Sequence, residues 1–87
     1  MIEIEANNIR LHDSLAIEDV DTLYKNLAEI KNKDACLIII DKIKEIHMAN
    51  LQILMSFKKT YPKTKFDIKD NNFQELLKKM GLLKFFI

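Results

Sequence analysis

The sequence ACLIIIDKIKEIHMANL, residues 35–51, decides the fold. Residues 35–41 are an isoleucine-rich apolar run that ends at Asp41, and such a run predicts a β-strand covered on both faces. From Met48 onward the apolar residues follow helical spacing, so a helix begins there. A strand that leads through a loop into a helix is half of a βαβ unit, and this loop is the usual position of a site in an open α/β sheet. We therefore expect the functional site within residues 41–55.

The residues before this stretch predict two strands and one helix. Residues 2–6 alternate between apolar and polar side chains, the period of a strand with one solvent-exposed face. After a turn at residues 7–8, the chain is expected to return as a second strand over residues 10–15. Apolar residues then recur at steps of three and four, which predicts an amphipathic helix over residues 17–32.

The residues after this stretch predict a helix, a strand and a second helix. The helix over residues 48–61 is expected to end there, because Pro62 disfavours helical geometry in the residue before it. Alternating side chains predict a strand over residues 64–68. Residues 70–72 offer side-chain caps for the next helix. Gly81, the only glycine, is expected to end that helix in the left-handed conformation.

Length and composition indicate one small domain over residues 1–87. The chain has 48% apolar and 31% charged residues, typical of a globular α/β protein and not of a disordered tail. The predicted order is ββαβαβα, with a mixed sheet of about four strands and helices packed against it. The apolar C-terminal residues 82–87 are expected to fold back on the core.

The expected cellular location of the protein rests on the membrane-spanning and signal-peptide patterns that the sequence does not show. No apolar run approaches the ~20 residues of a membrane-spanning helix, so we expect no membrane insertion. The acidic N-terminal residues do not follow the plan of a signal peptide. The presence of a single cysteine, Cys36, agrees with a reducing compartment. Because Cys36 lies at the start of a predicted buried strand, we interpret it as a small core residue. The cytoplasm is therefore the expected location.

Charge is distributed unevenly along the chain. Residues 1–41 carry four basic against nine acidic residues, and residues 42–87 carry ten lysines against four acids, so the halves are −5 and +6. A nucleic-acid patch is one interpretation, formed by Lys58, Lys59, Lys63, Lys65 and Lys69. Solvation of a helix end and a loop is the favoured interpretation, because the total charge is only +1 and the basic half contains no arginine. We expect no nucleic-acid partner.

Residues that carry chemistry are few. His12 and His47 lie far apart and have no second ligand at metal-binding spacing, so no metal site is expected. A single glycine cannot build a phosphate-binding loop. Asp41 and Glu45 are two carboxylates that could act as a catalytic acid and base. Lysines flank them in a predicted open loop, so the favoured interpretation is that both carboxylates are solvated. The sequence therefore predicts neither an enzyme nor a cofactor.

Three segments together resemble the STAS domain family. The strand ending at Asp41 and the following HMANLQIL, residues 47–54, are similar to the family's apolar strand, its Asp-Ser/Thr-Ser/Ala-Gly-Leu motif and its second helix. The segment FQELLKKMGLLKFF, residues 73–86, resembles the family's closing helix with its terminal Gly-Leu and aromatic residues. The segment IEDVDTL, residues 17–23, fits its first helix. The resemblance covers nearly the whole chain.

This resemblance implies a non-enzymatic domain that binds other proteins. Anti-sigma factor antagonists of the family capture a kinase-like anti-sigma factor at the loop and at the start of the second helix, and phosphorylation there breaks the complex. The leading expectation is such an interaction with a signalling protein. The alternative is a small cytoplasmic subunit of an ABC-type lipid transporter, which binds the transporter ATPase.

The chain departs from the family pattern at the regulatory position. Met48 matches the phosphorylated Ser/Thr and has no hydroxyl, so the phosphate switch cannot operate there. The hydroxyls of Ser56 and Thr60 lie two and three turns into the helix and are not assigned the role. Met48 either packs inward or is exposed to a partner. The predicted partner-binding patch consists of Lys44, His47, Met48, Asn50 and Gln52, in which His47 is either a pH sensor or a solvated loop residue.

Overall fold

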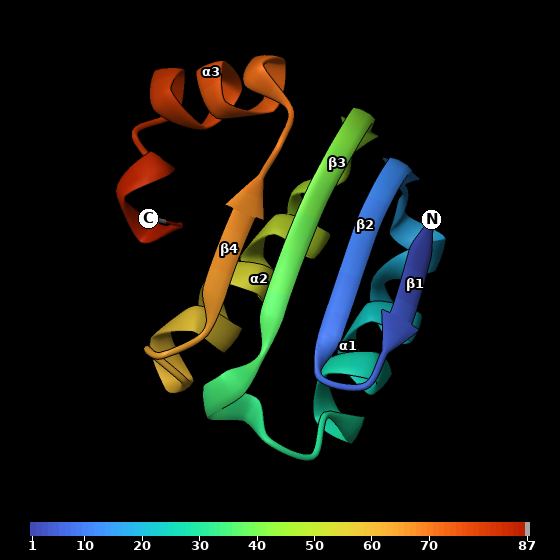
Figure 1. The fold of residues 1–87 in the computed structure, drawn as a ribbon. Helices are drawn as coiled ribbons and strands as arrows, with labels where there is room; N and C mark the ends of the chain where they lie inside the picture. The colour runs from blue at the N-terminus through green and yellow to red at the C-terminus, as the bar shows by residue number, and fades with distance from the viewer. Residues whose placement is uncertain (87) are drawn as a thin grey trace.

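A mixed sheet of four strands organises the fold, and the computed structural model describes residues 1–86 (Figure 1). β2 and β3 are parallel, as are β3 and β4, whereas β1 is antiparallel to β2 at the edge. The predicted α/β fold with a four-stranded mixed sheet and packed helices is confirmed. The strands are β1 (Ile2–Glu5), β2 (Asn8–Leu15), β3 (Leu37–Ile46) and β4 (Lys65–Ile68), and the helices are α1 (Val20–Glu29), α2 (Met48–Thr60) and α3 (Asn71–Lys79).

Three 3-10 helices make the order of elements differ from the predicted one. They are η1 (Ile17–Asp19), η2 (Lys33–Ala35) and η3 (Leu83–Phe85). The helix predicted over residues 17–32 is therefore a 3-10 turn followed by α1. α1 ends at Glu29 because Ile30 is extended and the ammonium of Lys33 donates to the carbonyl oxygens of Ala28 and Ile30, at 3.0 and 2.8 Å.

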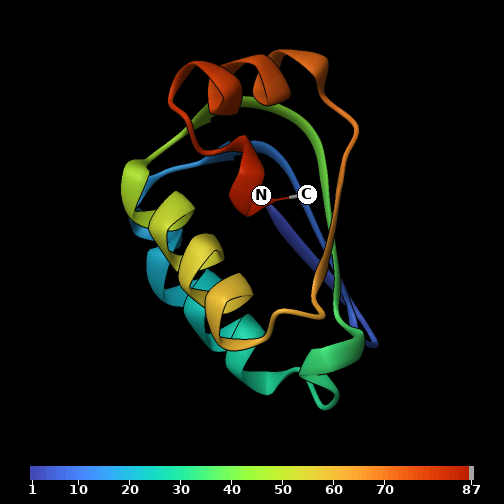
Figure 2. The ribbon, with the colours of Figure 1, turned by 90° about the vertical axis from the view of Figure 1, so that its left-hand side faces the viewer.

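The helices α1 and α2 lie side by side against one face of the sheet, and no helix of residues 1–86 covers the other face (Figure 2). The prediction that residues 35–41 are covered on both faces is therefore wrong. Ile38 and Ile40 are buried beneath the helices, whereas Leu37 and Ile39 are only half-buried. The physical reason is handedness: strands β2, β3 and β4 are added in one direction, and right-handed crossovers then place both helices on the same face.

β3 extends five residues beyond the predicted strand. Residues 42–46 pair with the end of β2 through Ile43, Glu45 and Ile46, across two register shifts. Asp41 and Glu45 therefore lie in a strand and not in an open loop. The carboxylate of Asp41 accepts a hydrogen bond from the backbone N–H of Lys42 at 3.1 Å.

The β1–β2 hairpin turns at Ala6 and Asn7, one residue before the predicted position, because β2 already begins at Asn8. Ala6 has φ 51°, a left-handed conformation that is costly for a residue with a Cβ.

Replacing Ala6 by glycine is expected to raise the free energy of unfolding by about 1 kcal/mol, because glycine adopts this conformation without strain. Ala28→Gly, on the exposed side of α1, is the matched control and is expected to lower it by about 0.5 kcal/mol. Urea denaturation measures both changes. Equal effects of the two substitutions would contradict strain at Ala6.

The start of α3 is tied to β3 by Asp70. Its carboxylate accepts hydrogen bonds from the backbone N–H groups of Ile43 at 2.9 Å, Asn72 at 2.9 Å and Phe73 at 3.4 Å. These donors, Ile43 first, hold the pKa of Asp70 below its usual value. The predicted side-chain cap is confirmed, as is Gly81, whose φ of 73° lies just beyond the end of α3.

The C-terminal residues return to the core as predicted. Phe86 is buried and packs edge-on against Phe66 of β4, with ring centroids 4.8 Å apart. Leu82 and Leu83 also pack against the core, whereas Phe85 is exposed. The part of the prediction that concerns Ile87 lies outside the described residues.

Cys36 is buried at the start of β3, as predicted. Burial raises the pKa of its thiol, so the unreactive protonated form is favoured. No helix within residues 1–86 has the length and apolar character needed to cross a bilayer.

Candidate functional site

The turn between β3 and α2 consists of one residue, His47. Its backbone N–H donates to the carbonyl oxygen of Leu15 at 2.7 Å, which fixes the turn beside the end of β2. Its side-chain Nδ1 accepts a hydrogen bond from the backbone N–H of Ala49 at 3.1 Å. His47 is therefore the N-cap of α2, a local role that requires Nδ1 to be unprotonated.

Met48 is the first residue of α2 and is 45% exposed. The sequence left open whether the Met48 side chain packs inward or is exposed to a partner, and the structure shows it exposed. The neighbouring 3-10 turn η1 contacts α2, and its Ile17 is also exposed. The sequence does not mark Ile17 as a surface residue, because Ile17 fits the apolar periodicity of the helix predicted over residues 17–32.

Asn50 is fully buried, with 0% exposure, so its predicted place in an exposed patch is wrong. Its Nδ2 donates to the carbonyl oxygens of Leu15 at 3.1 Å and Ala16 at 2.7 Å. Leu15 is the last residue of β2 and Ala16 follows it, so the buried amide joins the end of this strand to the first turn of α2. Oδ1 of Asn50 accepts no hydrogen bond from residues 1–86. Asn50 therefore holds the site together and does not face a partner.

Lys44 and Gln52 are exposed, but they lie on different sides of the molecule. Gln52 lines the helical side, next to Ala49. Lys44 lines a shallow hollow on the open face of the sheet, and its ammonium is 3.7 Å from a carboxylate oxygen of Asp13. Both partners of this ion pair are largely exposed, so it adds little stability. The structure thus keeps His47, Met48 and Gln52 near the start of α2 and separates Lys44 from them.

An apolar groove of about 610 Å³ runs between α1 and α2. Leu27 of α1 and Ile53 and Phe57 of α2 line it, and it begins at Ala49 and Gln52, close to Met48. Tyr24 on its rim is 66% exposed. Tyr24 fits the apolar periodicity of the helix predicted over residues 17–32, but α1 covers the sheet with Leu23 and Leu27, so Tyr24 is left at the surface. We call Ile17, Met48, Gln52 and this groove the α2 surface.

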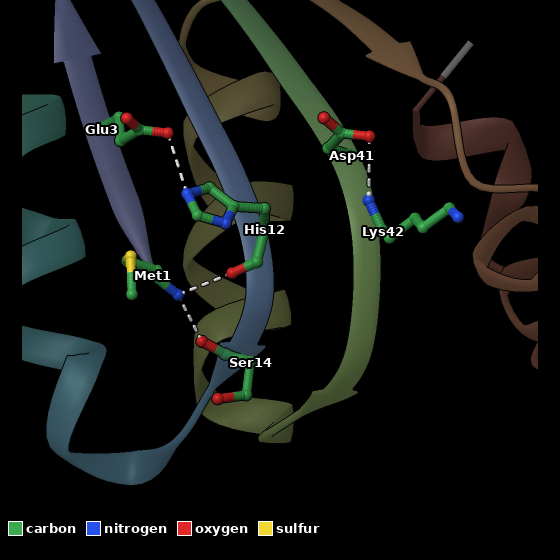
Figure 3. Close-up of polar contacts among 6 residues, drawn as sticks. All are labelled: Met1, Glu3, His12, Ser14, Asp41 and Lys42. Atoms are coloured by element: carbon green, nitrogen blue, oxygen red, sulfur yellow. Dashed lines mark hydrogen bonds and ion pairs between the residues drawn. The ribbon is translucent and has the colours of Figure 1, made fainter.

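The open face of the sheet carries charged side chains (Figure 3). Nε2 of His12 on β2 lies 2.8 Å from a carboxylate oxygen of Glu3 on β1. The amine nitrogen of Met1 donates to the carbonyl oxygens of His12 at 2.7 Å and Ser14 at 2.5 Å. Within residues 1–86 no three His, Cys, Asp or Glu side chains are grouped as a metal ion would require.

A comparison with known protein families finds none that the chain matches, and a comparison with curated proteins finds no relative. The resemblance to STAS domains therefore stays a prediction.

Proposed function

We propose that this chain is a STAS-like, non-enzymatic regulator that binds a signalling protein in the cytoplasm through the α2 surface. The observation that carries the proposal is the exposure of Met48 in the first turn of α2, beside an apolar groove. A thioether and an exposed tyrosine are side chains that protein interfaces favour. With the three 3-10 helices left aside, the order ββαβαβα with α1 and α2 on one face is compatible with the fold that the resemblance implies.

The first candidate partner is a kinase-like anti-sigma factor. A phosphate at the start of α2 would place about two negative charges beside the helix N-terminus, but Met48 cannot accept one. Residues 44–52 contain no Ser, Thr or Tyr, so this partner would be released by another means or bound permanently.

A transporter ATPase is the second candidate, and the methionine itself favours it. A permanent subunit of a transporter needs no phosphate switch at the interface, and an apolar contact at Met48 stabilises such a complex without regulation. The identity of the captured ATPase or kinase distinguishes the two candidates.

Affinity capture from the native lysate, followed by mass spectrometry and measurement of Kd, tests the proposal. Met48→Asp is expected to weaken binding of the captured partner roughly tenfold or more, because it buries a charge in an apolar contact. Leu76→Asp on α3, which is exposed to a similar degree as Met48, is the control and is expected to leave Kd unchanged. Unchanged binding by a folded Met48→Asp variant would remove Met48 from the interface, and salt-sensitive capture of nucleic acid would replace the proposal.

A further inference from the structure

The two edges of the sheet differ in how their outward backbone groups are satisfied. Lys65 and Lys69 of the β4 segment donate their N–H groups to β3, so the alternate residues Thr64, Phe66 and Ile68 face outward. The carbonyl oxygen of Ile68 accepts a hydrogen bond from the side chain of Gln74 at 2.9 Å, and that of Thr64 accepts one from the ammonium of Lys58. Side chains therefore guard both ends of the β4 edge against another strand, and Phe86 from the last turn of the chain packs on Phe66 between them.

The β1 edge has no such guard. Met1 and His12 exchange hydrogen bonds, and Glu5 and Asn8 close the two-residue turn, so residues 1, 3 and 5 face β2. The N–H and C=O groups of Ile2 and Ile4 consequently point away from the sheet. No side chain within residues 1–86 forms a hydrogen bond with these four groups, in contrast to the β4 edge. They are positioned to pair with an added strand.

The side chains of β1 define which strand fits. Glu3 and Glu5 are exposed on the open face, where Glu3 stands beside His12 (Figure 3). Ile4 points to the opposite face and is 46% exposed. In an added strand, alternate side chains lie next to these two glutamates and the others lie next to Ile4. Opposite charges across a strand pair stabilise it and like charges destabilise it.

We propose that the β1 edge binds an extended segment of another protein in which basic residues alternate with apolar ones. A second copy of this chain is a poor occupant. Antiparallel pairing of β1 with itself through Ile4 places Glu3 opposite Glu3 or Glu5 of the second copy. This site is independent of the α2 surface.

A hexapeptide, acetyl-Thr-Lys-Val-Lys-Val-Thr-amide, tests the proposal by NMR titration of the isotope-labelled protein. Shifts are expected at the amides of residues 2–5. Replacing both peptide lysines by glutamate is expected to weaken binding about tenfold at low salt, less so at high salt. Glu5→Lys leaves one acidic and one basic side chain on this edge and is expected to abolish the preference for lysine, and Glu29→Lys at the exposed end of α1 is the matched control that leaves the preference unchanged.

Backbone N-methylation separates strand pairing from charge attraction. In an antiparallel complex the two valines donate to β1, so methylating them is expected to weaken binding about tenfold, the loss of two net hydrogen bonds. In the same antiparallel complex the N–H groups of the two lysines point away from β1, so methylating the lysines is expected to leave binding intact. In a parallel complex the lysines donate to β1 instead, so methylation of the lysines weakens binding and methylation of the valines does not. Equal binding by both methylated peptides, shifts away from residues 2–5, or no binding near ~1 mM would overturn the proposal. Met48→Asp is expected to leave this peptide's binding unchanged, so a failure here is distinct from a failure at the α2 surface.

Discussion

Replacing Asn50 by aspartate is expected to lower the free energy of unfolding by about 3 kcal/mol or more at neutral pH. The amide Nδ2 donates to the carbonyl oxygens of Leu15 and Ala16 in a site with no solvent exposure. The substitution keeps the size and shape of the side chain but places a carboxylate oxygen against two carbonyl oxygens. A buried charge without a partner, together with two unsatisfied acceptors, accounts for the loss.

The pH dependence of this loss identifies its cause. Burial and the two carbonyls raise the pKa of the introduced carboxyl above its value in the unfolded chain. The difference in stability from the wild type is therefore smallest below about pH 4, where the carboxyl is protonated in both states and can donate one hydrogen bond. It grows as pH rises toward the raised folded-state pKa and is then constant.

Chemical denaturation at several pH values measures this difference. Asn72→Asp is the control, because Asn72 is exposed in the first turn of α3, where a negative charge is favourable. It is expected to change stability by less than about 0.5 kcal/mol. A similar small change for Asn50→Asp, or a loss that does not depend on pH, would contradict the role assigned to the buried amide.

Local signals in the sequence predicted element boundaries well where one residue determines them. The helix predicted over residues 48–61 is α2, Met48–Thr60, because Pro62 disfavours helical geometry just before it. Gly81 and Asp70 bound α3 for equally local reasons, a left-handed residue at its end and a carboxylate cap at its start. Each of these interactions involves residues within a few positions of one another.

Features that depend on the arrangement of the sheet were not predictable in this way. The apolar run at residues 37–40 has the same sequence pattern whether helices cover one face of the sheet or both. The strand order decides how many faces are covered. Asn50 was placed in a partner-binding patch, but its hydrogen-bond partners lie 34 and 35 residues earlier in the chain. Lys44 was grouped with Gln52 because they are close in sequence, although β3 carries Lys44 to the open face.

The last turn of the chain contains two adjacent phenylalanines with opposite environments, which allow a matched test of how the C-terminus is anchored. Phe86 is 1% exposed and packs edge-on against Phe66, whereas Phe85 is 44% exposed. Phe86→Ala is expected to lower the free energy of unfolding by about 3–5 kcal/mol, through lost apolar burial and the cavity left behind. For a domain of this size, that loss lowers Tm by about 15 °C or more.

Phe85→Ala removes the same side chain from the surface and is expected to cost less than about 1 kcal/mol. Thermal and urea denaturation of both variants measure the difference. A small domain has about 5–15 kcal/mol of stability in total, so Phe86→Ala removes a large part of it. Because Phe86 covers β4 from the end of the chain, its loss is also expected to expose the Phe66 ring and increase binding of a hydrophobic dye. Equal losses for the two variants would mean that the C-terminal residues do not pack on the core as the structure shows.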